Sequence, residues 1–340
     1  WHLKIEALNI DSVALYSGET DVDILSNQTT QVSMILSPTG KLIVNVDWTD
    51  EGFSISDYSA NPILSSSLDT LSKPTLGIFG SYILYMNGKY KMWYSGYYGN
   101  SKYDIHYAES SDGVSWQSVT NRAIISPNHF GTYDAQGIHA GPVIYENGIY
   151  RMYFACAPAA SGATYIGTAT SSDGIIWSNA NIPVIQETNT RFTPTALIKK
   201  DNQYLLYYAY ENVITLKHGV AVSVSNDGIN WNTYSEDVLL PEDSWEYPAI
   251  HYPTVQYINN KYVMIYSSMS NSGFGIATSS DGLTWTKEKN NPIFEPSLVS
   301  NSWTSQVRYP YLIKVGDNYR LYYTGYKNGL LQIGFATVTL

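Results

Sequence analysis

The chain has 340 residues, of which 44% are apolar and 14% are charged, a composition that predicts a folded core and excludes a disordered chain. Its 19 basic and 29 acidic residues give a formal net charge of -10, which argues against nucleic acid and anionic membranes as partners because both need a basic face. No run approaches the roughly 20 apolar residues that cross a bilayer, so membrane insertion is not expected. The 31 Tyr and 9 Trp favour β-sheet and are also typical of surfaces that stack on sugar rings.

Residues 1–48 form an N-terminal β extension that the sequence pattern does not place relative to the rest. Leu42, Val44, Val46 and Trp48 alternate with other residues, which predicts one strand there. The low Lys content and the many Ser, Thr, Asn and Tyr residues favour an extracellular or cell-surface protein.

Two elements repeat at intervals of about 55–60 residues along the rest of the chain. An Asp-Gly pair precedes an aromatic residue at 112–116, 173–177, 227–231 and 281–285. Asp-Gly between apolar runs predicts a tight hairpin in which both turn residues have φ > 0. An aromatic strand recurs upstream at 90–94, 150–154, 204–208, 262–266 and 319–323.

The repeat predicts an all-β fold, a five-bladed β-propeller with four-stranded antiparallel blades. The last unit begins near Tyr309 and ends after its third strand. Residues 50–55 and 61–64 mirror 281–285 and 291–294, so we expect residues 49–64 to supply the missing strand and close the ring. The propeller then spans residues 49–340.

Loops that lead into the innermost strands of a propeller converge on its axis, so we expect the binding site in that axial funnel. Asp134 and Glu246 each follow an aromatic residue on such a loop. Two carboxylates across a sugar site suit glycosidic cleavage, one as the acid and the other as base or nucleophile. The alternative is that both carboxylates fix their own loops by accepting backbone hydrogen bonds.

Six further residues on these loops are candidates for substrate binding. The arginines are expected to hold a carboxylate or hydroxyl of the substrate and the tyrosines to floor a sugar ring, while each histidine could instead bond to a neighbouring blade. The six are His139, Arg191, His251, Tyr252, Arg308 and Tyr309. No phosphate loop, zinc motif or cysteine cluster is present, so no metal site is assigned and no cofactor is required. Calcium in the central channel stays open, and the oligomeric state is not predicted.

Residues 50–340 resemble the five-bladed propellers of the furanosidase superfamily, typified by glycoside hydrolase family 43 and its family 32-like relatives. The resemblance rests on blades of the form seen at 147–154, 166–169 and 172–177. The turn at 279–285 is also similar to a sialidase Asp-box but lacks the residue between Asp and Gly, so the sialidase alternative ranks lower.

The resemblance implies catalytic Asp residues at two inner-strand positions and a general-acid Glu at a third. The aligned positions hold Ser81, Gly141 and His251, so the family's usual carboxylates are not matched.

The leading hypothesis is a secreted glycan-active protein, a glycoside hydrolase-like propeller acting on a poly- or oligosaccharide. The alternative is a non-catalytic glycan- or surface-binding propeller, such as an adhesin or receptor-binding module. In a third hypothesis the funnel is plugged and the outer surface makes protein contacts.

Overall fold

A computed structural model describes residues 2–8, 14–21, 30–35, 41–46, 53–67, 74–100, 102–158 and 162–339. The chain divides into one unit of Trp1–Ser54 with Thr339–Leu340 and a second unit of Ile55–Val338. Trp48 of the predicted first strand, residues 49–52 of the predicted closing strand and the loop 68–73 lie outside the described residues.

The first unit contains two antiparallel strand pairs. The pairs are β1 (His2–Leu8) with β2 (Ala14–Asp21), and β3 (Thr30–Ile35) with β4 (Lys41–Val46). The strand β4 contains the alternating residues at 42, 44 and 46 that predicted it.

The second unit consists of antiparallel sets of strands that follow one another along the chain. The first set is β6 (Gly77–Met86), β7 (Lys89–Gly99), β8 (Lys102–Ser110) and β9 (Gln117–Ser118). The second is β11 (Val143–Glu146), β12 (Ile149–Ala157), β13 (Tyr165–Ser171) and β14 (Ser178–Ile185), with β10 (Gly137–His139) beside β12. The third is β15 (Thr190–Lys200), β16 (Gln203–Asn212), β17 (His218–Ser225) and β18 (Asn232–Ser235).

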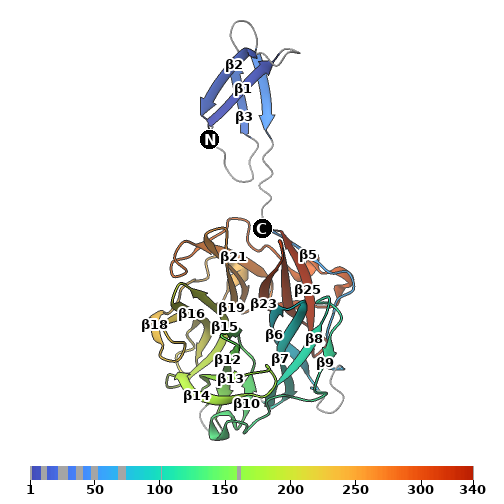
Figure 1. Cartoon of the computed structure of the whole chain (residues 1–340), viewed down its shortest axis with the longest axis vertical. Coiled ribbons are helices and arrows are strands. Elements are labelled where there is room, and N and C mark those ends of the chain that lie inside the picture. The colour runs from blue at the N-terminus through green and yellow to red at the C-terminus, as the bar shows by residue number, and fades with distance from the viewer. Residues whose placement is uncertain are drawn as a thin grey trace. The chain divides into compact units, whose positions relative to one another are not determined.

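The remaining strands form two more sets. The fourth set is β19 (Ile250–Ile258), β20 (Lys261–Ser268), β21 (Phe274–Ser279) and β22 (Thr286–Lys287). The last set is β23 (Gln306–Val315), β24 (Asn318–Lys327), β25 (Leu330–Thr339) and the early strand β5 (Ser54–Asp57). Figure 1 shows these sheets arranged around a common centre, with β6, β15, β19 and β23 nearest to it. The described residues thus form an all-β structure built of four-stranded antiparallel sheets, and among them no helix is long and apolar enough to span a bilayer.

The early segment of the second unit is bonded to the end of the chain. The strand β5 pairs with β25, and the amides of Ile63 and Leu64 donate to the carbonyl of Ile333. The Asn61 side chain donates to the carbonyl of Phe335 at 2.8 Å and accepts its amide at 2.9 Å. Residues 54–64 therefore complete the last sheet, which would otherwise end in an exposed edge.

The Asp-Gly turns differ from the predicted hairpin. Their glycines have φ between 72° and 82°, but none of their aspartates has a positive φ. The Asp carboxylate instead accepts the two amides that follow the turn: Asp112 Oδ1 lies 2.8 Å from the nitrogen of Val114 and 2.7 Å from that of Ser115. These backbone hydrogen bonds lower the pKa of Asp112. The prediction that both turn residues need φ > 0 is therefore wrong, because the Asp side chain closes the turn from ordinary backbone geometry.

The glycine carbonyl of each turn accepts a hydrogen bond from the sheet that precedes it in chain order, and the turn of the first sheet accepts one from the last sheet. We call this contact the inter-sheet latch. Each donor holds the fourth position of the repeated aromatic strand. The four latches are Trp93 Nε1 to Gly174 at 2.8 Å, Tyr153 OH to Gly228 at 2.7 Å, Tyr207 OH to Gly282 at 2.5 Å and Tyr322 OH to Gly113 at 2.9 Å. The latches bury polar groups between sheets with each group paired.

We predict that Gly228→Ala destabilises the protein more than Gly148→Ala. Both glycines have positive φ, so both substitutions carry a backbone cost of about 1–2 kcal/mol. A Cβ at position 228 would also lie 2.7 Å from the Tyr153 hydroxyl, whereas one at 148 would meet no atom within 4 Å. The extra loss at 228, about 1–3 kcal/mol from the broken latch, is measurable by urea denaturation. Equal losses for the two variants would contradict the role of the latch.

Candidate functional site

Three of the innermost strands carry a β-bulge at the same level. The strand pairing skips Gly80-Ser81 in β6, Tyr252-Pro253 in β19 and Tyr309-Pro310 in β23, so two residues face one on the partner strand. Gly80, Tyr252 and Tyr309 have φ of 62°, 50° and 52°. Such a backbone is strained for tyrosine, and bulges of this kind redirect side chains at functional sites.

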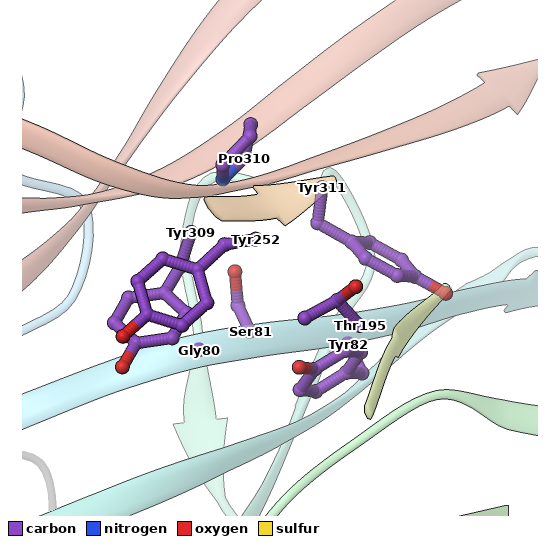
Figure 2. A pocket seen from close by; sticks show the side chains of 8 residues that line it. All are labelled: Gly80, Ser81, Tyr82, Thr195, Tyr252, Tyr309, Pro310 and Tyr311. Carbon is purple, nitrogen blue, oxygen red and sulfur yellow. The ribbon is translucent and has the colours of Figure 1, made fainter. Parts of the chain in front are cut away.

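The bulged tyrosines lie against each other at the centre of the sheets. The rings of Tyr252 and Tyr309 stack with centroids 3.9 Å apart (Figure 2). Together with Gly80, Ser81 and Tyr82 they line a cavity of about 10 Å³, which has room for about one water molecule. At this depth the centre of the sheets is therefore filled by side chains.

Aromatic contacts extend the tyrosine pair into a continuous group, which we call the axial cluster. Phe79 joins it through Tyr309 at 5.2 Å and through His139 at 5.5 Å, and His139 lies 4.0 Å from Tyr103. On the other side, His251 lies 5.0 Å from Tyr252, all distances being between ring centroids. The members of the axial cluster are Phe79, Tyr103, His139, His251, Tyr252 and Tyr309.

The two predicted histidines are held neutral. Burial lowers the pKa of His139 to about 4, and burial with the neighbouring His218 lowers that of His251 to about 4. His139 Nδ1 and His251 Nε2 are buried and have no hydrogen-bond partner among the described residues. Neither of these nitrogens bonds to a neighbouring sheet there, although both are enclosed by protein atoms.

The two predicted arginines lie in different surroundings beside the cluster. Arg191 Nη1 pairs with Glu211 at 3.3 Å, and its Nε donates to the carbonyl of Gly162 at 3.0 Å. Burial raises the pKa of Tyr103 to about 12, and the charge of the Arg191 guanidinium opposes that rise. Arg308 Nη2 donates to Gln306 Oε1 at 2.5 Å, while its Nε is buried without a partner among the described residues. Four of the six predicted binding residues thus belong to the axial cluster, and Arg308 precedes Tyr309 in β23.

The predicted catalytic carboxylate Asp134 is fully buried in its own loop. It lies at the end of a 3-10 turn, Gly131–Asp134, and both its oxygens accept the Phe130 amide at 3.2 Å. Burial raises its pKa. Asp134 is not among the residues that line the central cavity.

The other predicted carboxylate, Glu246, is also fully buried and bonded on both oxygens. It accepts from Lys287 Nζ at 2.6 Å, from the Tyr266 hydroxyl at 2.7 Å and from the backbone amides of Glu242 and Asp243. These contacts form a capping box around the 3-10 turn Ser244–Glu246. The geometry gives Glu246 the loop-fixing contacts of the alternative prediction, and its catalytic role stays a prediction.

The positions where the family resemblance implies catalytic carboxylates have no acidic side chain. Ser81 lines the central cavity with its hydroxyl buried. A Cβ at Gly141 would lie 2.2 Å from the carbonyl oxygen of Tyr153, so only glycine fits there. Within the described ranges, no three His, Cys, Asp or Glu side chains gather in an arrangement that could hold a metal ion.

Sequence analysis missed Phe79, Tyr103, His218 and Glu211 at this site. They lie on β6, β8, β17 and β16, whereas the candidates were predicted on the loops before the innermost strands. Tyr103 pairs with Gly137 and Glu211 pairs with Arg191, so each lies opposite a residue of a predicted loop. They could have been identified from the sequence by also considering the residues at the strand ends that lie opposite each predicted loop.

We predict that Glu246→Gln lowers the free energy of unfolding by about 3 kcal/mol at pH 7, because it removes the buried carboxylate that lies 2.6 Å from the Lys287 ammonium and leaves that lysine the more distant, exposed Glu242. Burial alone would raise the pKa of Glu246, but hydrogen bonds from the Glu242 amide, Lys287 and Tyr266 hold that pKa below its ordinary 4.5. The ionised Glu246 carboxylate therefore stabilises the fold above pH 4.5, and this stabilisation is lost as the pH falls below that value. The free energy of unfolding of Glu246→Gln should not show this decrease.

Glu242→Gln is the matched control. Glu242 lies 3.6 Å from the same lysine but its side chain is 74% exposed, so we expect a change below about 1 kcal/mol. Urea denaturation between pH 3 and 7 measures both variants. A Glu246→Gln protein as stable as the wild type would show that the carboxylate does not fix its loop.

Comparison with known proteins connects this fold to carbohydrate-active enzymes. The model of the glycosyl hydrolases family 32 N-terminal domain matches residues 140–290 and 193–335, together more than half of the chain. A search among curated protein sequences finds no match.

Solved structures with similar folds are glycoside-processing proteins at low identity. A thermostable family-43 glycoside hydrolase has a TM-score of 0.62 and 18% identity, covering 77% of this chain and 88% of its own. The α-L-arabinofuranosidase from Lactobacillus brevis has a TM-score of 0.62 and 14% identity, covering 82% and 92%. The β-1,2-mannobiose phosphorylase from Listeria innocua has a TM-score of 0.64 and 13% identity, covering 83% and 96%. The chain belongs to the family of the glycosyl hydrolases family 32 N-terminal domain.

Proposed function

We propose that the protein is glycan-active and binds a poly- or oligosaccharide above the bulged tyrosines. The observation that carries the proposal is the axial cluster, where stacked aromatic rings lie beside unpartnered histidine and arginine nitrogens. Aromatic faces suit the apolar faces of sugar rings, and the free nitrogens suit their hydroxyls.

We infer that the sheets form a closed five-bladed ring around this site. The innermost strands β15, β19, β23 and β6 contact one another in that order, and the Tyr322 latch to Gly113 joins the last sheet to the first. A closed ring would hold the bulges of β6, β19 and β23 at one level around the axis. The same proposal places the protein outside the cell or on its surface, where polysaccharides are found.

Hydrolysis and binding without turnover are the two activities open to such a site. The family supports hydrolysis, for which Asp134 and Glu246 are the proposed acid and base or nucleophile. A separate observation favours binding without turnover: Asp134 and Glu246 are both buried and form hydrogen bonds with nearby residues that hold their loops. In that case the protein would act as an adhesin or receptor-binding module.

A hydrolysis and binding screen over polysaccharides and aryl glycosides tests the proposal. We expect the wild type to bind at least one glycan and Tyr309→Ala to weaken that binding about tenfold, because it removes one face of the stack. Tyr234→Ala, on a tyrosine that is 58% exposed, is the control and should leave binding unchanged. Binding to no glycan, or equal binding by all three proteins, would contradict the proposal.

The same screen decides between the two activities. Turnover that is lost in Asp134→Asn or Glu246→Gln, with circular dichroism showing a folded protein, would establish those carboxylates as catalytic. Binding without turnover in the wild type and both variants would leave a propeller that recognises sugars.

A further inference from the structure

Arg308 has no counter-charge in the described part of the chain. None of its nitrogens lies within 4.0 Å of a carboxylate oxygen there, and its Nε is buried without a hydrogen-bond partner. Its contacts are neutral, namely the Gln306 amide oxygen and the ring of Tyr326, 5.5 Å from the guanidinium carbon. Arg191 on the same side of the site is neutralised by Glu211. A partly buried guanidinium without a partner carboxylate is costly unless a ligand supplies the anion.

Other nitrogens without a hydrogen-bond partner lie near Arg308, on histidines beside the stacked tyrosines. Tyr309 follows Arg308 in β23 and stacks on Tyr252, which adjoins His251. His251 is 7% exposed with its Nε2 unpartnered, and the ring of His218, whose Nδ1 is also unpartnered, lies 6.1 Å away. Burial raises the pKa of Tyr252 and the Arg308 guanidinium opposes that rise, which places the guanidinium near this ring.

We propose that the sugar bound here is acidic, and that Arg308 pairs with its carboxylate while His251 contributes a second hydrogen bond. This inference rests on the proposed glycan-binding function and names its substrate class. Guanidinium groups bind carboxylates with two parallel hydrogen bonds. Because Arg308 Nε is enclosed by protein atoms, the carboxylate would pair with the two Nη atoms, of which Nη2 also donates to Gln306 Oε1. The tyrosine pair would then support the ring to which the carboxylate is attached.

The net negative charge of the protein would confine binding of an acidic sugar to the surroundings of Arg308. At a net charge of -10, an anionic glycan is repelled by most of the surface and gains affinity only where a positive charge is left unpaired. Glu211 is the nearby carboxylate, and its charge is balanced by Arg191. Binding of the acidic sugar should therefore weaken as the salt concentration rises.

Isothermal titration calorimetry with a galacturonic acid trisaccharide and the galactose trisaccharide of the same linkage tests the inference. We expect the wild type to bind the acidic sugar at least about tenfold more tightly. Arg308→Met should lose this preference and keep its affinity for the neutral sugar. Arg308→Lys should be intermediate, because it keeps the charge without the paired donors.

Arg122→Met is the control, because it removes one positive charge from an exposed residue and should retain the preference. Circular dichroism and a titration with the neutral sugar verify that each variant is folded. Equal wild-type affinity for the two sugars, or a preference that survives in Arg308→Met, would overturn the inference alone. Binding of inorganic phosphate but not of the acidic sugar would show a free-anion site and also overturn it. Binding of neither sugar, nor of any glycan in the screen, would overturn the proposed function itself.

Discussion

The inter-sheet latch is the contact on which the arrangement of the sheets depends. A buried hydroxyl or indole N–H of one sheet donates to the glycine carbonyl of a neighbouring turn, and the absence of a Cβ makes the approach feasible. The fourth sheet holds Ile265 at the donor position and has no latch of this kind among the described residues. There the link to the last sheet is made by Gln256 and Thr254, both bonded to the backbone of Leu312.

Fixed sheets allow strain to be concentrated at the centre. Two tyrosines adopt a left-handed backbone in β19 and β23, a conformation that persists only where the surrounding structure imposes it. The strain presents the stacked rings next to Arg308 and His251, the groups with vacant nitrogens. The strained bulges are therefore also part of the proposed binding site.

The repeat made the sheets predictable, because hydrophobic alternation and Asp-Gly turns act locally. The central position of four candidates could be expected from their loops, since loops before innermost strands gather at one end. These are His139, His251, Tyr252 and Tyr309, and their role in binding stays a prediction. The surroundings of Glu246 could not, because Lys287 is distant in sequence and its approach depends on the pairing of β21 with β22. The bulges at Tyr252 and Tyr309 were equally hidden, because nothing in the residue pattern marks a left-handed tyrosine.

A crystal structure of the protein with a bound oligosaccharide tests the central claim most directly. The account predicts a sugar ring against Tyr309 and Tyr252, with its polar groups toward Arg308 and His251. A sugar bound instead on the outer surface, for example in the hollow lined by Lys200 and Tyr262, would contradict it.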